Sequence, residues 1–322
     1  MAKILITGVA GFIGFHLARK LLEDEWKIVG IDNLSPYYSV ELKQKRLDIL
    51  KDYSNFKFIK IDFGDWERLY SVLNNIKFDM IVHLGAQAGV RYSLENPWTY
   101  FYSNDLGTLN IFELARRKNV EKVIFASSSS VYGGNKKIPF SEEDRVDKPI
   151  SLYAVTKRAN ELMAWTYHYL YGVNMVGLRF FTVYGEFGRP DMAYFKFAKN
   201  IMNNEPVKIY GHGKLKRDFT YISDIVDGII KAMNADIEFE IINLGNNRPI
   251  ELNYFISLLE KYLGIEAKKI YVEKPKVDVE VTYADISKAK KLLNWEPKVT
   301  IEEGLKRFCD WFIENWDWIK KI

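Results

Sequence analysis

The chain has 322 residues, of which 48% are hydrophobic and 27% charged, and its net charge is +4. That length suggests two domains, or one large domain with a lobe. No stretch approaches the ~18 consecutive apolar residues of a membrane span, and the first residues run straight into an expected strand rather than a signal peptide. The basic residues form no stripe interleaved with aromatics, which argues against nucleic-acid binding. A single cysteine, Cys309, allows no intrachain disulfide, so we predict a soluble, cytoplasmic protein.

Apolar runs alternate with helical patterns over the first 184 residues. The apolar runs are continuous rather than alternating, which is typical of a parallel sheet covered by helices on both faces. We expect strands at Ile4–Thr7, Lys27–Ile31, Phe56–Ile61, Met80–Leu84, Lys122–Ala126 and Met175–Leu178. We expect helices at Gly11–Glu25, Val40–Leu50, Trp66–Asn74, Leu106–Lys118 and Leu152–Tyr171.

After about Gly185 the pattern changes to helices, short strands and turn-rich stretches, without a second clean series of alternating strands and helices. We therefore predict an α/β protein. Residues 1–184 would form a doubly wound parallel sheet and residues 185–322 mainly a smaller mixed α/β lobe, and later segments can return to the sheet.

Three glycines, Gly8, Gly11 and Gly14, follow the first expected strand and open the first expected helix. Without side chains they allow a tight turn, close approach to a pyrophosphate and close packing of helix on strand, while the helix N-terminus offers N–H groups. Asp32 ends the next strand, where a carboxylate can accept hydrogen bonds from both adenosine ribose hydroxyls and would repel a 2′-phosphate. Either feature alone could be an ordinary turn. Together they predict a Rossmann-type site for NAD rather than NADP, to which we also assign Phe12, Ile13 and Asn33.

Tyr153 and Lys157 form a YxxxK pattern in an expected helix, and positions i and i+4 share one helix face. Lowering a tyrosine pKa from about 10 to about 7 takes roughly 4 kcal/mol, much of which a nearby ammonium can supply and a nicotinamide cation can supplement. We predict that Tyr153 is a general acid–base and that Lys157 lowers its pKa. Ser128 lies at the end of the fifth expected strand, where open α/β sheets bind ligands, and its hydroxyl can hydrogen-bond the oxygen on the reacting carbon.

The glycine spacing and the YxxxK pattern resemble those of the extended short-chain dehydrogenase/reductase superfamily, and the resemblance covers the whole chain. It implies that Asp62 and Phe63 flank the adenine of NAD and that Leu84 and Ala86 line the middle of the cofactor. His83, which precedes this last run, is expected to be structural. A closer resemblance, to UDP-glucuronate 4-epimerases of the NAD-dependent epimerase/dehydratase family, lies in GIDNLSPYY (30–38), QAGVRYSLENP (87–97), TKRANELM (156–163), LRFFTVYG (178–185), GRPDM (188–192) and RDFTY (217–221).

The residues after Ser128 distinguish related reactions, all of which begin by removing hydride from C4 of a nucleotide sugar. Sugar-nucleotide 4,6-dehydratases carry Asp-Glu where this chain has Ser129-Ser130, and UDP-glucuronate decarboxylases typically carry Glu in place of Ser130. With neutral hydroxyls at both positions, the simplest sequel is return of hydride to the opposite face of C4, which is epimerisation of UDP-glucuronate to UDP-galacturonate. The alternatives are a UDP-glucose/UDP-galactose 4-epimerase, a UDP-glucuronate decarboxylase, a net dehydrogenase and a non-catalytic NAD-binding regulator.

A 4-keto uronic acid loses CO2 fastest when the carboxylate C–C bond stands perpendicular to the carbonyl plane. Ser129, Ser130 and Thr182 are candidate donors that would hold the carboxylate away from that geometry. Thr182 lies where galactose-type epimerases usually have Asn, and it could instead be a packing residue. Arg91 and Arg189 could pair with a carboxylate or a diphosphate, or form surface ion pairs.

The resemblance also implies contacts with the rest of a UDP-sugar: Arg217 with the diphosphate, Val207 to Tyr210 along the uridine, and Asp278 at the ribose. Pro275-Lys-Val-Asp278 replaces the family's usual Gln-Pro-Gly-Asp, so the backbone at the ribose should differ from that of the relatives. No metal site is expected. The resemblance further implies a homodimer through the helices around 106–117 and 152–169.

Overall fold

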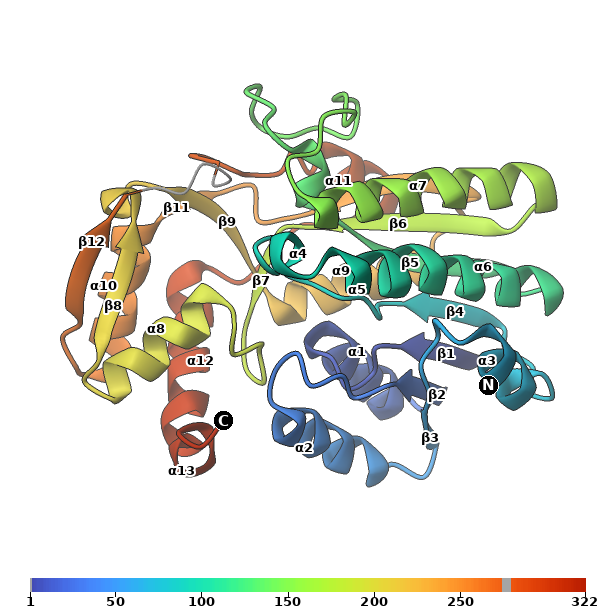
Figure 1. Ribbon diagram of the computed structural model, residues 1–322, viewed down its shortest axis with the longest axis horizontal. Coiled ribbons are helices and arrows are strands. Elements are labelled where there is room, and N and C mark those ends of the chain that lie inside the picture. Colours follow the sequence, from blue (N-terminus) through green and yellow to red (C-terminus); the bar gives the residue numbers. More distant parts are fainter. Residues whose placement is uncertain (1, 274–278) are drawn as a thin grey trace.

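The computed structural model describes residues 2–273 and 279–322, and a seven-stranded sheet forms its centre (Figure 1). The strand order is β10-β6-β5-β4-β1-β2-β3, and every neighbouring pair is parallel. The strands are β1 (Lys3–Thr7), β2 (Lys27–Asp32), β3 (Phe56–Lys60), β4 (Met80–His83), β5 (Lys122–Ser128), β6 (Asn174–Phe180) and β10 (Phe239–Leu244). The first six confirm the strands expected from the sequence. Chain order reverses between β1 and β4, and such a switch point is where open α/β sheets bind ligands.

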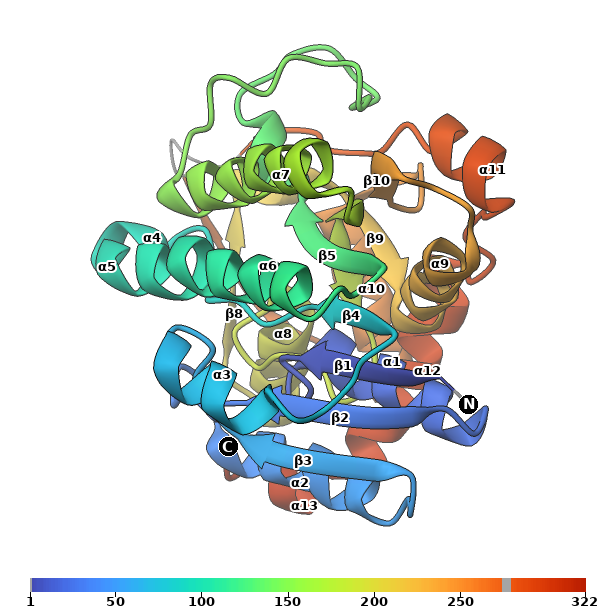
Figure 2. The same cartoon turned by 90° about the vertical axis from the view of Figure 1, so that its right-hand side faces the viewer.

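Helices cover both faces of this sheet because alternate side chains of each strand point to opposite faces. In β1, Ile4 and Ile6 pack into one hydrophobic core and Leu5 into the other. Figure 2 shows helices on both sides of the sheet. The first core includes α1 (Phe12–Glu23), α2 (Val40–Lys51) and α9 (Ile222–Asn234), and the second includes α3 (Trp66–Leu73), α6 (Gly107–Arg117) and α7 (Leu152–Tyr171). Strands buried on both faces explain the continuous apolar runs in the sequence.

Helical structure before α6 begins earlier than the sequence predicted. Two short helices, α4 (Tyr92–Glu95) and α5 (Pro97–Tyr100), lead into a π-helical turn, η1 (Phe101–Leu106), and then into α6. Pro97 stands at the start of α5, where a missing N–H costs no helical hydrogen bond. A π-helical turn has no simple periodic signature, and such turns are frequent at functional sites.

Residues after 184 contribute to the large sheet as well as to a smaller lobe. β10 pairs with β6, and α9 packs against α1, so this part of the chain returns to the first 184 residues. The smaller lobe holds two further sheets, β11-β9-β7 and β12-β8 (Figure 1). Its strands and helices are β7 (Thr182–Tyr184), α8 (Ala193–Met202), β8 (Pro206–Tyr210), η3 (Gly211–Gly213), β9 (Lys216–Tyr221), β11 (Pro249–Glu251), α10 (Leu252–Leu263), β12 (Lys268–Val272), α12 (Ile301–Glu314) and α13 (Trp316–Ile319). The helix α11 (Ser287–Leu293) packs instead against β10 and α9, on the large sheet. A domain boundary at residue 184 remains a prediction.

The segment before α12 is joined to α9 by a buried tryptophan. Trp295 is 1% exposed, and its indole N–H donates to the Asp224 carbonyl at 2.9 Å. The Asp224 carboxylate accepts from the backbone N–H groups of Lys298 and Val299, each at 3.0 Å. Truncating a buried tryptophan to alanine typically costs about 3–5 kcal/mol, so this contact is a substantial part of the C-terminal packing. Over the described residues, no helix combines the length and apolar character that crossing a bilayer requires.

Candidate active site

A cavity of about 440 Å³ lies at the carboxyl ends of β1, β2, β4 and β5. Carboxyl ends of parallel strands meet at one edge of a sheet, which brings together residues that are far apart in the sequence. All the residues predicted for the cofactor and for catalysis line this cavity: Gly8, Gly11, Phe12, Ile13, Gly14, Asp32, Asn33, Asp62, Phe63, Leu84, Ala86, Ser128, Tyr153 and Lys157. Their individual roles remain predictions.

The glycine turn at the end of β1 is too tight for side chains. Gly8 has a φ of +68°, and its carbonyl accepts a hydrogen bond from Gly11 N–H at 2.9 Å. A Cβ atom on Gly14 would lie 2.2 Å from this same carbonyl oxygen, and one on Gly11 would lie 2.9 Å from it. The first turn of α1 therefore sits directly on the loop, with Phe12 and Ile13 at the cavity wall, which is the arrangement that binds a pyrophosphate. The cradle fits a dinucleotide.

Asp32 ends β2 at the cavity, and its carboxylate already accepts two hydrogen bonds from the backbone. It accepts from Leu34 N–H at 2.8 Å and from Ala10 N–H at 3.2 Å. Burial raises the pKa of Asp32, and the nearby Lys43 ammonium acts in the opposite direction. Lys43 lines the same cavity and donates from Nζ to the Ser35 carbonyl at 2.6 Å. A positive charge thus accompanies the carboxylate that was predicted to bind ribose hydroxyls.

Lys43 was missed by the sequence analysis, although a signal existed. It lies four and seven positions before Leu47 and Leu50 of α2, both of which are buried, so it shares their inward face. Several other residues that line the cavity were not predicted as site residues from the sequence: Ser35, Tyr37, Tyr38, Gln87, Thr99, Tyr102, Ser103, Phe180, Phe181 and Met192.

Tyr153 and Lys157 project from the first two turns of α7, whose N-cap is Ser151. The Ser151 hydroxyl accepts from Ala154 N–H at 3.1 Å. Lys157 is 4% exposed, and its ammonium donates to the Ala126 carbonyl of β5 at 2.7 Å. Burial lowers the pKa of Lys157 to about 8.

The electrostatics of Tyr153 differ from the sequence-based expectation. Burial raises the pKa of its phenol above 10, while the Ser128 hydroxyl and the Arg189 charge act to lower it. The Lys157 ammonium donates to the Ala126 carbonyl, and the lowering of the Tyr153 pKa that was expected from its charge remains a prediction. The protein groups alone therefore leave Tyr153 protonated at neutral pH.

Three consecutive serines, Ser128 to Ser130, form a short turn where β5 ends, and the first of them contacts the Tyr153 phenol. Ser128 ends β5, and its Oγ accepts from Ser130 N–H at 3.2 Å as the turn η2 (Ser129–Tyr132) begins. Among the described residues, the Ser130 Oγ is buried without a hydrogen-bond partner. A buried hydroxyl of this kind calls for a partner. Ser129, Ser130 and Thr182 themselves are not part of the cavity wall, unlike Ser128.

Arg189 is the predicted substrate residue from the smaller lobe that lines the cavity. Its Nε donates to Asp191 Oδ1 at 3.0 Å, and a second contact from Nη2 makes the pair bidentate. Tyr37 of the large domain donates to the same carboxylate at 3.2 Å. This pairing presents Arg189 at the junction of the two parts of the molecule.

The remaining substrate candidates lie farther out. The Arg91 guanidinium stands 4.7 Å from the centre of the Tyr210 ring, so two residues 119 positions apart meet. Val207 is fully buried in β8. Arg217 Nη1 donates to the carbonyls of Lys216 and Glu280. Asp278 lies outside the described residues.

His83 is structural, as expected. Its Nδ1 hydrogen-bonds Thr7 at 2.7 Å and its Nε2 hydrogen-bonds Thr108 at 3.0 Å. Burial lowers its pKa to about 3, so the ring is neutral and joins β4 to β1 and α6.

A dinucleotide cradle and a Tyr-Lys-Ser group that share one cavity define an NAD-dependent enzyme of the Rossmann type. The chain belongs to the NAD dependent epimerase/dehydratase family, whose sequence model matches residues 4–245. It is 49% identical to UDP-glucuronate 4-epimerase of Thermodesulfobacterium geofontis, over 100% of this chain and 99% of the relative.

Two solved structures are closely similar. UDP-glucuronic acid 4-epimerase from Bacillus cereus, in complex with UDP-glucuronic acid and NAD, is 36% identical, with a TM-score of 0.90 over 97% of this chain and 99% of that one. UDP-glucose 4-epimerase from Thermotoga maritima, with UDP-glucose, is 32% identical, with a TM-score of 0.90 over 98% of this chain and 99% of that one.

Proposed function

We propose that the protein is a UDP-glucuronate 4-epimerase, an isomerase that interconverts UDP-glucuronate and UDP-galacturonate through a 4-keto intermediate with NAD. The observation that carries the proposal is the neutral serine turn, Ser128 to Ser130, whose first member lines the cavity together with Tyr153. Related dehydratases carry acids in that turn that expel water from the 4-keto sugar, and decarboxylases typically carry Glu there. The Thermodesulfobacterium and Bacillus cereus relatives support the choice of sugar.

Each protein group has one task in this reaction. A bound NAD would supply the hydride acceptor for C4 and, in its reduced form, the hydride donor to the opposite face, and its cationic ring would add positive charge to the site. Tyr153 takes the proton of the C4 hydroxyl and later returns it. Ser128 hydrogen-bonds the C4 oxygen throughout. Lys157 keeps an ammonium beside the site, and together with the Arg189 charge it favours the phenolate over the phenol.

The 4-keto uronate must keep its carboxylate. A hydrogen bond from the unpartnered Ser130 hydroxyl, with further donors at Ser129 and Thr182, would hold the carboxylate out of the geometry from which CO2 leaves. Arg91 and Arg189 would neutralise the carboxylate or the diphosphate. The uridine and diphosphate would stay on the lobe, along Val207 to Tyr210 and at Arg217, while the sugar turns its other face to the cofactor.

A UDP-glucose/UDP-galactose 4-epimerase is the second candidate, favoured by the equal TM-score of the Thermotoga maritima structure. One position argues against this second candidate, because galactose-type enzymes usually carry Asn where this chain has Thr182. The proposed function needs donors for a carboxylate, and the second candidate needs none.

Proton NMR of the purified protein incubated with UDP-glucuronate tests the assignment directly. We expect the anomeric signal of UDP-galacturonate to appear without added cofactor, because NAD is regenerated in each turnover. Conversion of UDP-glucose but not UDP-glucuronate would replace the substrate and keep the reaction type. Release of CO2 with a pentose product would identify a decarboxylase, and accumulation of NADH absorbance would identify a net dehydrogenase.

We also propose a homodimer formed by α6, α7 and the turn before α6. Large apolar side chains lie exposed there: Leu106, Leu109, Leu162, Trp165 and Tyr169, the last at 74%. Burying such a stripe against a second copy would remove it from water. Light scattering should give twice the monomer mass for the wild type. The Trp165→Glu variant should have the mass of a monomer. Ile313→Glu, at an exposed site on α12, should leave the dimer intact.

A cytoplasmic location is proposed as well, because the one thiol, Cys309, is buried and the chain needs no disulfide. Cell fractionation with periplasmic and cytoplasmic marker enzymes measures it.

A further inference from the structure

The end of β5 is held by α7 through three consecutive residues. The Ala126 carbonyl accepts from Lys157 Nζ at 2.7 Å, and the Ser127 hydroxyl donates to Glu161 Oε1 at 2.6 Å. The next residue, Ser128, interacts with Tyr153. Tyr153, Lys157 and Glu161 are spaced by four, so they lie on one face of the helix. The third member of this row, Glu161, has no part in the proposed chemistry.

Glu161 forms a buried ion pair with Arg179 of β6. Their side chains are 1% and 2% exposed. The pair is bidentate, with Nε to Oε1 at 2.8 Å and Nη2 to Oε2 at 2.9 Å. Arg158, whose side chain is 34% exposed, adds an outer contact to Oε2 at 2.9 Å. Such planar two-point contacts fix orientation as well as charge.

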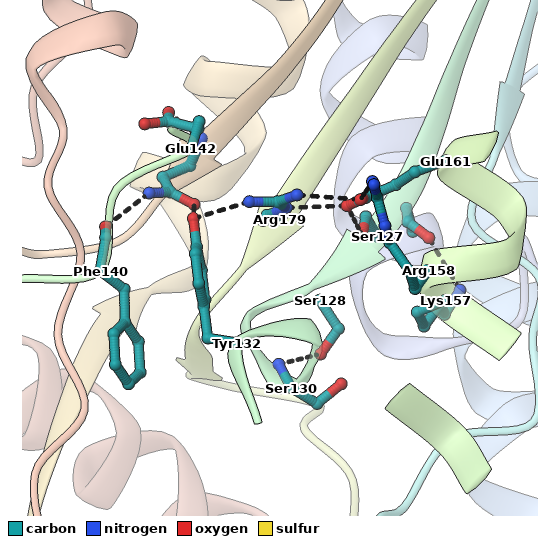
Figure 3. A network of polar contacts seen from close by, with 12 residues as sticks. Ser127, Ser128, Ser130, Tyr132, Phe140, Glu142, Lys157, Arg158, Glu161 and Arg179 are labelled. Atoms are coloured by element: carbon teal, nitrogen blue, oxygen red, sulfur yellow. Dashed lines mark hydrogen bonds and ion pairs between the residues drawn. The ribbon is translucent and has the colours of Figure 1, made fainter. Parts of the chain in front are cut away.

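The pair also reaches the far end of the serine turn. Arg179 Nη1 donates to the Tyr132 hydroxyl at 3.0 Å, and that hydroxyl donates to Asn243 Oδ1 of β10 at 2.6 Å. Figure 3 shows Arg179 lying between Glu161 on one side and Tyr132 on the other. Ser127 and Tyr132 stand at the two ends of the segment that carries Ser128, Ser129 and Ser130. Glu161 and Arg179 together hold both of those ends.

We propose that Glu161 and Arg179 are positioning residues for the reaction, which hold the segment 127–132 so that Ser128 faces Tyr153. This positioning role rests on the proposed function only because its tests measure the rate of the proposed epimerisation. Misplacement of reacting groups by about 1 Å can cost on the order of 100-fold in rate, so a small loosening of this segment is measurable.

The charges around Lys157 define the expected pH effect. Asp105 of η1 and Glu161 of α7 both raise its pKa against the lowering by burial. His83 of β4 faces the same ammonium and is neutral, because burial lowers its pKa to about 3. Burial acts to raise the pKa of Glu161, but the hydrogen bonds and charge of Arg179, with Ser127 and Arg158, outweigh it, so the pKa is lowered and Glu161 stays ionised. Removing the Glu161 charge therefore lowers the pKa of Lys157, and the ammonium is lost at lower pH.

Ser127→Ala is the mildest test, because it removes the hydroxyl that joins β5 to Glu161 and leaves the ion pair in place. We expect kcat for UDP-glucuronate to fall about tenfold with KM, bound NAD and the thermal midpoint unchanged. Ser127→Thr keeps the hydroxyl and should restore kcat to within about twofold of wild type. The wild-type enzyme is assayed first with both sugars. If it converts UDP-glucose rather than UDP-glucuronate, kcat of each variant is compared with wild-type kcat for UDP-glucose.

Glu161→Gln tests the charge, and Arg158→Gln is its matched control because it removes the outer partner of the same carboxylate. We expect the alkaline limb of the kcat profile to move to lower pH for Glu161→Gln and to stay in place for Arg158→Gln. Wild-type kcat in Ser127→Ala would overturn the proposal. So would an unmoved alkaline limb in Glu161→Gln, whether or not its thermal midpoint falls, because that result would leave the pair a purely structural role.

Discussion

The Arg46 guanidinium donates twice to the Phe187 carbonyl oxygen, from Nε at 3.1 Å and from Nη2 at 2.6 Å. Arg46 belongs to α2 and is fully buried, and Phe187 lies where the chain enters the smaller lobe. Nη1 of the same arginine donates to the Ala10 carbonyl in the glycine loop at 2.7 Å. One side chain thus joins the nucleotide cradle to the segment that carries Arg189 into the cavity.

Arg46→Met should therefore destabilise the protein and loosen the cradle. The variant loses charge-assisted hydrogen bonds to Ala10, Phe187 and Gly188 and leaves their carbonyls buried without this donor. We expect a loss of about 3 kcal/mol or more in the free energy of unfolding. Arg19→Met, which removes an exposed ion pair with Glu23 on α1, should stay within about 0.5 kcal/mol. Urea denaturation of both variants measures the difference, and equal midpoints would contradict the role given to Arg46.

Tyr153→Phe should strongly slow inversion at C4 while leaving the fold and bound NAD in place. The substitution removes only the phenolic oxygen, so the packing against the Tyr100 ring, 6.1 Å away between centroids, is retained. General acid–base groups contribute roughly 100- to 10,000-fold to rate, and we expect a loss of kcat in that range. Conversion followed by proton NMR, with thermal melting as the control for folding, checks this. A Tyr153→Phe enzyme with near wild-type turnover would exclude Tyr153 as the proton carrier.

Activity should fall on the alkaline side as Lys157 loses its charge. Burial lowers the pKa of this lysine to about 8. In the proposed mechanism its ammonium form favours a phenolate at Tyr153. As pH rises through that value, the fraction of ammonium decreases and kcat should decrease with it. A pH–rate profile in non-interacting buffers measures the limb, and a rate that stays constant to pH 10 would show that the lysine charge is not needed.

Gly14→Ala should prevent nucleotide binding, because its Cβ would lie 2.2 Å from the Gly8 carbonyl oxygen and force α1 away from the loop. Gly134→Ala is the matched control, since a Cβ there meets only Ile150 Cγ2, at 3.8 Å. We expect Gly14→Ala to be purified without NAD and to melt at lower temperature than wild type, and Gly134→Ala to keep both properties. NAD released by acid and measured by chromatography reports the outcome.

Asp32→Asn should weaken NAD binding and reduce the preference for NAD over NADP. The amide can still accept a backbone hydrogen bond but no longer repels a 2′-phosphate, and the Lys43 charge beside it becomes available to one. We expect about a tenfold loss of NAD affinity, the scale of one charged hydrogen bond. Calorimetric titration of cofactor-free protein with NAD and NADP tests this, and an unchanged ratio of affinities would remove Asp32 from the selectivity.

The sequence by itself determined the local features of this protein. The order of strands and helices, the glycine turn at Gly8 to Gly14, Asp32 at a strand end, and Tyr153 and Lys157 on one helix face all depend on near neighbours. Periodicity, backbone freedom and a spacing of four residues are properties of short segments, so a reader of the sequence can evaluate them directly. The convergence of these features on one cavity then follows from the parallel topology.

Only the tertiary structure decided which side chains meet across long stretches of chain. Arg46 reaches Phe187, Arg91 lies over Tyr210, and Arg179 joins Glu161 to Tyr132, because packing of whole elements sets those distances. It also decided the electrostatics of Tyr153, whose pKa burial raises where the sequence alone suggested a lowering by Lys157. Burial and the direction of an ammonium depend on every neighbouring element, and no spacing within one helix can specify them.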